Sequence, residues 1–340
     1  MSRIFRIALI PKFFRLLRII KPLIYRYASV KFRFPLAGIT IVAGITVVAG
    51  MMPFFTALIS SAQASSTGQQ ISNEAHLGLT ELFRTESYYD YNLYWSFIKV
   101  GTAQLKFSVQ NAESSDSDPR PKLVIHFTAQ SDPILNSFYP VTSKIESTLL
   151  VENLKPHYYQ KHLKQGNENE HSILYFDWEK EKIFETKNGI ASDPIDAVEG
   201  CQDPLSLILA ICQNDFQNNP YHEQSVTDGG KIIELKSQLS GTEPVNSSVG
   251  SFHSQRIAIE THDLRGVFKK SPDANLFLFL HRLNDASPAL PIKIQSKVTI
   301  GSFYAVLSGG MHQGLPIRGI KAKKTSPTIH SRERIFRKFK

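Results

Sequence analysis

The distribution of charge along this chain argues against binding to nucleic acids. The 340 residues carry a formal net charge of +9, which is typical of proteins that bind nucleic acids. The excess lies at the two ends, because residues 65–310 hold 21 basic and 29 acidic residues. An acidic central region repels a phosphate backbone, and it contains no helix-turn-helix, zinc-finger or RNA-motif signature. We therefore expect no nucleic-acid partner.

The N-terminal segment, residues 1–64, contains nine basic residues and no acidic one. Within it, residues 36–60 are uncharged and mostly apolar, and a membrane-spanning helix needs about 20 such residues. Ala62-Gln63-Ala64 matches the small-x-small pattern of a signal peptidase site. The segment is predicted to be a signal peptide cleaved after Ala64, or else an uncleaved N-terminal anchor in the inner membrane. Either way, the rest of the chain is predicted to be exported to the periplasm.

Residues 65–87 are rich in Ser, Gln, Asn and Gly and are predicted to be a linker to a domain over 88–310. In that domain apolar and polar residues alternate repeatedly, which indicates about a dozen antiparallel strands with one buried face. The predicted strands are 89–95, 103–109, 123–129, 145–151, 156–165, 172–178, 182–187, 233–239, 255–260, 276–283, 292–300 and 302–307.

One segment, residues 203–212, has the pattern of a helix. Asp203 is a favoured N-cap residue and Pro204 a favoured first helical residue. Apolar residues surround the helix almost completely, so we expect it to be buried and to plug or cover an open end of the sheet. The helix would separate Cys201 from Cys212 by more than a disulfide allows, so two buried or half-buried thiols are expected.

These elements predict an all-β, mainly antiparallel fold: a single curved sheet that closes into a β-barrel or half-barrel, with one short buried helix. Curling is expected because open twisted sheets rarely exceed about ten strands. A barrel of more than about eight strands leaves interior room for a ligand. The aromatic residues near the start of the domain could line such a space, and we name Tyr89, Tyr91, Trp95 and Phe107 as candidate ligand-binding residues. Core packing explains them equally well.

No local signature of a common hydrolase, zinc enzyme or nucleotide-binding enzyme is present, so no catalytic residue, cofactor or metal ligand is predicted. His157, His162 and His171 lie on adjacent predicted strands but are expected to be exposed, because the odd spacing of the first two places them on opposite faces. Four acidic residues inside apolar or aromatic stretches are also candidates for acid–base chemistry, and solvated strand faces or the helix cap explain them better: Asp90, Glu146, Asp177 and Asp203.

Residues 311–340 carry nine basic residues and one acidic residue and are predicted to be a disordered tail. The alternative is that 332–340, where Ile335, Phe336 and Phe339 lie among cations, contacts anionic lipid headgroups.

With the strands placed, the chain resembles the uncharacterised exported bacterial family DUF3108 from about Tyr88 to Gly309. The matching pieces, in order, are Tyr91-Asn92-Leu93-Tyr94-Trp95 with Val100-Gly101-Thr102-Ala103, Phe138-Tyr139-Pro140-Val141 with Ile145-Glu146-Ser147, Gln202-Asp203-Pro204-Leu205-Ser206, Asp228-Gly229-Gly230-Lys231, and Pro291-Ile292-Lys293-Ile294-Gln295-Ser296 with Gly301-Ser302-Phe303. The chain departs from the family pattern at 241–252 and beyond Gly310. The resemblance implies an exported β-rich protein and supplies no reaction, cofactor or catalytic residue.

Three functions remain open at this point. The first is a non-enzymatic periplasmic envelope protein that binds a lipid-like or other amphiphilic ligand in a β-barrel groove. The second is a scaffold or partner-binding module of the cell envelope. The third is a hydrolase whose active site is assembled from dispersed residues.

Overall fold

The computed structural model describes residues 83, 85, 87–110, 120–136, 139–260, 275–283, 287–297 and 302–320. These residues form a single antiparallel sheet of sixteen strands and two helices, which confirms the predicted all-β class. The strands are β1 Ser87–Trp95, β2 Ile98–Gln110, β3 Lys122–Ser131, β4 Val141–Leu150, β5 Pro156–Gln165, β6 Glu168–Asp177, β7 Lys182–Lys187, β8 Ile190–Ala191, β9 Ile195–Asp196, β10 Tyr221–Thr227, β11 Ile232–Ser247, β12 Gly250–Ile259, β13 Asn275–His281, β14 Leu290–Lys297, β15 Ser302–His312 and β16 Leu315–Pro316. The helices are α4 Pro133–Asn136 and α5 Pro204–Gln213.

Sequence neighbours pair along most of the sheet, and one pairing joins its two halves. The strand order is β10-β11-β12-β13-β14-β15-β1-β2-β3-β4-β5-β6-β7-β8, with β16 beside β15 and β9 beside β7. Among the strands that the structure describes, only the β15–β1 pair brings together strands that are far apart in the chain. The first long strand is thereby held against the last long strand.

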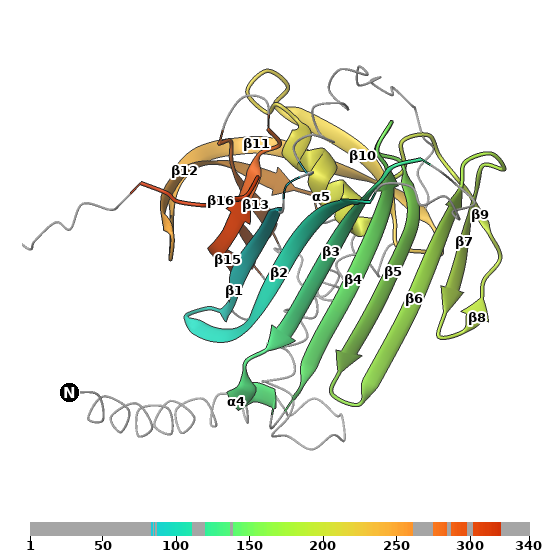
Figure 1. Cartoon of the computed structure of the whole chain (residues 1–340), viewed down its shortest axis with the longest axis horizontal. Helices are drawn as coiled ribbons and strands as arrows, with labels where there is room; N and C mark the ends of the chain where they lie inside the picture. Colours follow the sequence, from blue (N-terminus) through green and yellow to red (C-terminus); the bar gives the residue numbers. More distant parts are fainter. Residues whose placement is uncertain are drawn as a thin grey trace, which may run out of the picture.

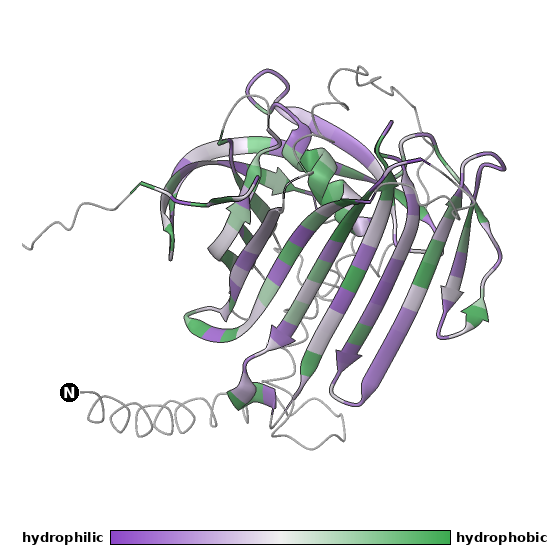
Figure 2. Ribbon diagram, in the orientation of Figure 1, coloured by the Kyte–Doolittle hydropathy of each residue, from purple (hydrophilic) through white to green (hydrophobic). Residues whose placement is uncertain are grey.

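The longer strands bury alternate residues, and most of their apolar side chains lie on the concave side of the sheet. On β1, Tyr89, Tyr91 and Leu93 are buried, and the residues between them are partly exposed. Tyr89 lies opposite Leu105 of β2, so the buried side continues across the strands. Figure 2 shows the resulting alternation of hydrophobic and hydrophilic residues along β2 to β6. A period of two residues gives this pattern because successive side chains of a strand point to opposite faces.

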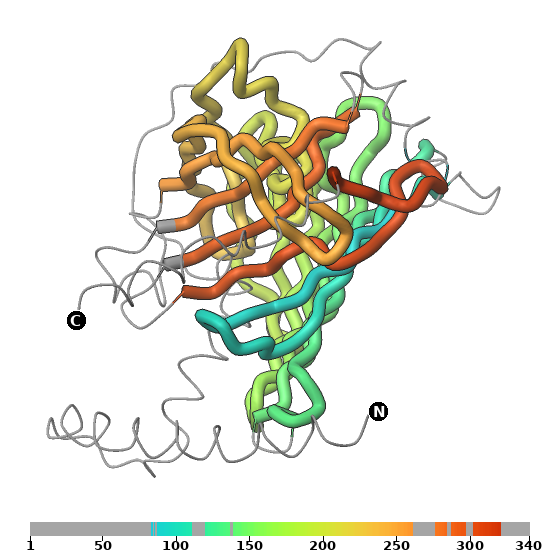
Figure 3. Tube along the Cα trace, turned by 90° about the vertical axis from the view of Figure 1, so that its left-hand side faces the viewer, coloured from blue at the N-terminus to red at the C-terminus, as the bar shows by residue number. Residues whose placement is uncertain are grey.

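The sheet bends into two arms, so the molecule is a half-barrel and not a closed barrel. Strands β1 to β8 form a broad curved arm, and β10 to β14 cross behind it with α5 between the two arms (Figure 1). The side view in Figure 3 shows the same crossing of the two arms. The terminal strands β10 and β8 do not pair with each other. Gln202, in the segment after β9, forms an isolated parallel bridge with Val226 of β10.

Several elements differ from the sequence-based expectation. The sequence did not predict strand β10, because Tyr221–Thr227 is mostly polar. It did not predict helix α4 either, because Pro133–Asn136 forms only a single turn. The polar insert at 241–252 proves to be the end of β11, a turn and the start of β12.

The predicted domain end at Gly310 is too early. Strand β15 continues to His312, β16 follows, and Ile317 is only 5% exposed. Two consecutive glycines, Gly309 and Gly310, interrupt the apolar alternation at this point, although the backbone remains paired. Residues 311–320 therefore belong to the folded domain and not to a disordered tail. The remainder of that predicted tail, 321–340, lies outside the described residues.

The predicted signal peptide or anchor, 1–64 with its apolar stretch 36–60, also lies outside the described residues, as does the predicted linker apart from Phe83, Thr85 and Ser87. Among the residues that the structure does describe, no helix is long and apolar enough to span a membrane.

Candidate ligand-binding site

The candidate site lies beside α5, which the sequence anchors firmly at its first turn. Asp203 is the N-cap residue, and its carboxylate accepts hydrogen bonds from the backbone N–H groups of Leu205 and Ser206, at 2.8 and 3.1 Å. The Ser206 hydroxyl accepts a bond from the Asp203 N–H in return, which completes a capping box. The predicted cap and the Pro204 start are thus confirmed. Ser147 of β4 donates to the second carboxylate oxygen and ties the helix to the sheet.

The body of α5 forms a wedge between the two arms of the sheet. Leu205 and Leu209 pack in the main core with β1 and β2, whereas Leu207, Ile211 and Cys212 pack against β10 to β13. Apolar residues on opposite sides of the helix are buried for this reason, as its all-round apolar pattern predicts.

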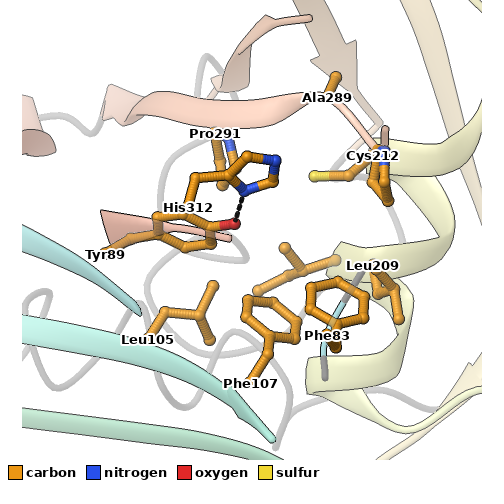
Figure 4. A pocket seen from close by; sticks show the side chains of 11 residues that line it. Phe83, Tyr89, Leu105, Phe107, Leu209, Cys212, Ala289, Pro291 and His312 are labelled. Atoms are coloured by element: carbon orange, nitrogen blue, oxygen red, sulfur yellow. Dashed lines mark hydrogen bonds between the residues drawn. The ribbon is translucent and has the colours of Figure 1, made fainter. Parts of the chain in front are cut away.

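A small cavity remains where α5 meets β1, β2 and β15. Its volume is about 20 Å³, and its walls are almost wholly apolar. The lining residues are Phe83, Tyr89, Leu105, Phe107, Ile208, Leu209, Cys212, Pro288, Ala289, Pro291 and His312. Figure 4 shows side chains from the sheet and from α5 converging on this space.

His312 and Tyr89 form the polar wall of the cavity. Tyr89 Oη lies 2.8 Å from His312 Nδ1 (Figure 4). His312 is 8% exposed, and its Nε2 has no hydrogen-bond partner among the described residues. Burial lowers the pKa of His312 and raises the pKa of Tyr89, so both side chains are neutral at pH 7. If the phenol donates to Nδ1, then Nε2 carries the ring proton and can donate it to a ligand.

Cys212 contributes a thiol to the same cavity, and its chemistry is that of an apolar side chain. Burial raises the pKa of the Cys212 thiol to about 12. The thiolate, which is the reactive nucleophile, is therefore scarce at neutral pH. Cys201 is buried and free as well, so neither cysteine forms a disulfide in the structure.

The cavity brings together two of the four predicted ligand-binding residues. Tyr89 and Phe107 line it, and their rings are 5.7 Å apart in an edge-on arrangement. Tyr91 is buried beside it and donates its hydroxyl to the carbonyl of Pro291, at 2.8 Å. Trp95 lies at the far end of β1, where it stacks on Phe303, and it does not line the cavity.

Sequence reasoning missed most of the other lining residues. Phe83 falls in the predicted linker, yet it stacks on Phe107 with ring centroids 4.8 Å apart. His312 falls beyond the predicted domain end. Leu209 and Cys212 could have been found, because a helix that is apolar all round must present some of its residues to the concave face.

The four acidic residues considered for acid–base chemistry each have a partner of their own. Asp90 accepts a bond from Gln104, Glu146 pairs with His126, and Asp177 pairs with Lys180. Asp203 caps α5. None of these contacts joins two of the four acids, so they lend no support to a hydrolase with a dispersed site.

The three strand histidines do not converge as a group. His157 packs against Tyr175. His162 and His171 lie opposite each other on β5 and β6, on the outer face of the sheet. Partial burial lowers the pKa of His162, and the nearby His171 and Lys144 lower it further. Within the described ranges, no group of three or more His, Cys, Asp or Glu side chains is arranged to hold a metal ion.

Comparisons with known proteins identify a family and two solved structures of low similarity. The model of the family described as "Protein of unknown function (DUF3108)" matches residues 90–308, which confirms the resemblance seen in the sequence motifs. A β-barrel-like protein of the domain of unknown function DUF1849 from Brucella abortus is similar, with a TM-score of 0.43 and 8% identity over 67% of this chain and 98% of that one. A Bacteroides fragilis protein with a YmcC-like fold is similar with a TM-score of 0.29 and 10% identity, over 68% and 95%. A search of the curated proteins finds no match.

Proposed function

The chain belongs to the DUF3108 family, whose function is unknown, and on that premise we propose that it is a non-enzymatic periplasmic envelope protein that holds an amphiphilic ligand between α5 and its curved sheet. Membership alone names no ligand. The support comes from the interior of the half-barrel and from the N-terminal sequence.

One observation carries the proposal: the cavity beside α5 combines apolar walls with a single unsatisfied polar atom. Leaving a buried polar group without a partner costs about 1–3 kcal/mol, so such groups are uncommon in folded proteins. His312 Nε2 is such a group. A ligand with an apolar body and one hydrogen-bonding group would satisfy it while covering the apolar walls. This is the chemistry of an amphiphile.

The cavity must widen before it can hold more than a water molecule, because a volume of about 10–15 Å³ corresponds to one water-sized sphere. The C-terminal half of α5 contributes Leu209 and Cys212 to the wall. The N-terminal end of the helix is held by the Asp203 cap and Ser147. We infer that the ligand enters by displacing the C-terminal half of α5 while its N-terminal end stays attached to β4.

The periplasmic location rests on residues 1–64, with their cationic and then apolar sequence. An envelope location would bring the domain close to amphiphiles, because lipid membranes bound the periplasm. The N-terminal segment would also keep the domain at the membrane surface if it is not cleaved.

Binding of the fluorescent apolar probe N-phenyl-naphthylamine tests the proposal. Ala289 lines the cavity and is 4% exposed, so Ala289→Leu should fill the space and weaken the probe's binding. Ala191→Leu makes the same chemical change on the exposed strand β8 and should bind as the wild type does. Thermal melting of both variants confirms that they are folded. Equal probe binding by folded Ala289→Leu and wild type would rule out this cavity.

A second candidate function, partner binding in the envelope, is favoured by apolar side chains on the outside of the sheet. Tyr175, Phe184 and Ile190 are 42%, 39% and 74% exposed, on neighbouring strands at the β8 end. Exposed apolar patches often mark contact surfaces. A photo-crosslinking residue at Phe184 should capture an envelope protein, and one at Tyr304, on β15, should not. Labelling that is equal at both positions would count against this role.

A further inference from the structure

Two histidines face each other on the outer surface of the sheet, on the side away from α5. His162 of β5 and His171 of β6 occupy directly opposite positions in the strand register. Their ring centroids are 3.9 Å apart and their planes are 13° from parallel. The side chain of His162 is exposed and that of His171 partly so. The pair is therefore open to solvent and to ions.

Gln160 shows where the lone pairs of the two rings point. It lies two residues before His162, on the same face, and its amide nitrogen is 2.9 Å from Nε2 of His162 and 2.8 Å from Nε2 of His171. An amide nitrogen can only donate, so both ring nitrogens accept. Both Nε2 atoms then lie within hydrogen-bond distance of the same amide nitrogen, and the ring protons reside on Nδ1. Neutral imidazole with a free lone pair is the form that binds metal ions.

We propose that His162, His171 and Gln160 form a surface site for a divalent transition metal ion, with Cu²⁺ bound most tightly. A half-turn of the Gln160 amide replaces its nitrogen by the carbonyl oxygen and supplies the third ligand. Imidazole suits copper, nickel and zinc, and among these ions affinity is greatest for Cu²⁺. Water completes the coordination shell, as is usual where the protein supplies only part of it.

The surroundings limit the strength of this site without blocking it. Lys144 lies opposite His162 on β4, and its positive charge disfavours a cation. Glu146 lies opposite Gln160 on the same strand and has the reverse effect, although it also pairs with His126 at 3.3 Å. His126 is a lone imidazole beside a carboxylate on the same outer face. It therefore offers a matched control.

Titration of the full chain without an affinity tag, stripped of metal by EDTA, tests the site. Calorimetry with CuCl₂ should show a first molar equivalent that binds more tightly than any later one. His162→Asn, His171→Asn and the double variant should each lose this tight phase, and His126→Asn should keep it. Electron paramagnetic resonance of the first equivalent should show coupling to imidazole nitrogen, and that coupling should vanish in the double variant. Melting in EDTA verifies that every variant is folded.

Substitutions of Gln160 test whether its side chain is a metal ligand or only supports the two histidines. Gln160→Glu places a carboxylate at the third position and should tighten Cu²⁺ binding, whereas Gln160→Leu should weaken it. An unchanged tight phase in the double histidine variant, or no tight phase in the wild type, would overturn the site. Weaker binding by Gln160→Glu would overturn the assignment of Gln160 as a ligand.

Discussion

Two buried carboxyl groups, Asp203 and Asp228, show how single residues interrupt the apolar interior. Asp203 is fully buried at the N-terminus of α5, and Asp228 is 9% exposed at the turn after β10. Burial raises the pKa of Asp203 to about 6 and that of Asp228 to about 8, against an ordinary Asp value of 3.8. Hydrogen bonds to Asp203 and the charge of Lys161 near Asp228 oppose these rises but do not cancel them.

The first prediction concerns Asp228 and the pH dependence of stability. Its pKa is higher in the folded than in the unfolded chain, so the folded state binds the proton more tightly. The stabilisation is complete below pH 3.8 and is lost as the pH rises through about 8. The free energy of unfolding should therefore fall between pH 5 and pH 9, and Asp228→Asn should flatten this fall. Urea denaturation at several pH values measures the free energy of unfolding of the wild type and of Asp228→Asn.

A matched control is available on the surface at Asp193, which is exposed. Asp193→Asn should leave the pH profile of the wild type unchanged. A profile for Asp228→Asn as steep as that of the wild type would show that this carboxyl group does not retain its proton in the folded protein.

The second prediction concerns the cap of α5. Asp203→Ala removes the acceptor for the N–H groups of Leu205 and Ser206 and leaves Ser147 without its partner, so it should cost about 1–2 kcal/mol at pH 7. Asp203→Asn keeps an acceptor and relieves the burial of a charge, so its effect should stay within about 0.5 kcal/mol. Chemical denaturation measures the free energy of unfolding of both variants and of the wild type. Equal losses from both substitutions would indicate that the negative charge, and not the cap, is required.

The residues of the candidate site were predictable only where they belong to a regular pattern. Tyr89 and Phe107 could be named because alternation in β1 and β2 assigns them to the buried face. The same pattern also selected Trp95, since periodicity gives the face of a strand and not the position along the concave surface. His312 could not be found in this way, because two glycines precede it and it contacts Tyr89 from 223 residues further along the chain.

At the scale of the elements, the C-terminal segment shows where pattern reading fails. Residues beyond β15 cross to β12, where Ser251 and Ile320 exchange backbone hydrogen bonds of 2.9 and 3.0 Å. Gly250 and Gly319 meet at this crossing, and a Cβ on Gly250 would lie 2.6 Å from the carbonyl carbon of Gly319. Such backbone contact leaves little trace in the hydrophobic pattern. The longer strands, by contrast, were predictable: β5 and β7 match their predicted ranges, 156–165 and 182–187.

The third prediction tests the contribution of this segment. Ile317 is 5% exposed and packs in the main core, so Ile317→Ala should cost about 2–5 kcal/mol. Leu315 is 71% exposed, two residues earlier, and Leu315→Ala should change stability by no more than about 0.5 kcal/mol. Urea denaturation of the two variants gives the comparison. Similar small losses for both would mean that the segment is not part of the folded core.

At the scale of the whole molecule, strand count and alternation were enough to predict a curved antiparallel sheet, but not its two-armed shape. The shape depends on the pairing of β1 with β15 and on α5 between the arms, and both are long-range contacts. Local periodicity holds no information about which distant strands pair. The ligand proposal depends on this shape, because the cavity exists only where residues from β1, β2, α5 and β15 meet.

Native mass spectrometry of the chain purified from its envelope fraction, without detergent exchange, tests the central claim most directly. If the protein holds an amphiphile beside α5, the wild type should carry an added mass that organic extraction removes and that is identifiable as a lipid-like molecule. Folded Ala289→Leu should carry less of it, and Ala191→Leu as much as the wild type. A wild-type chain that repeatedly appears at its bare polypeptide mass, with nothing recovered in the extract, would contradict the account.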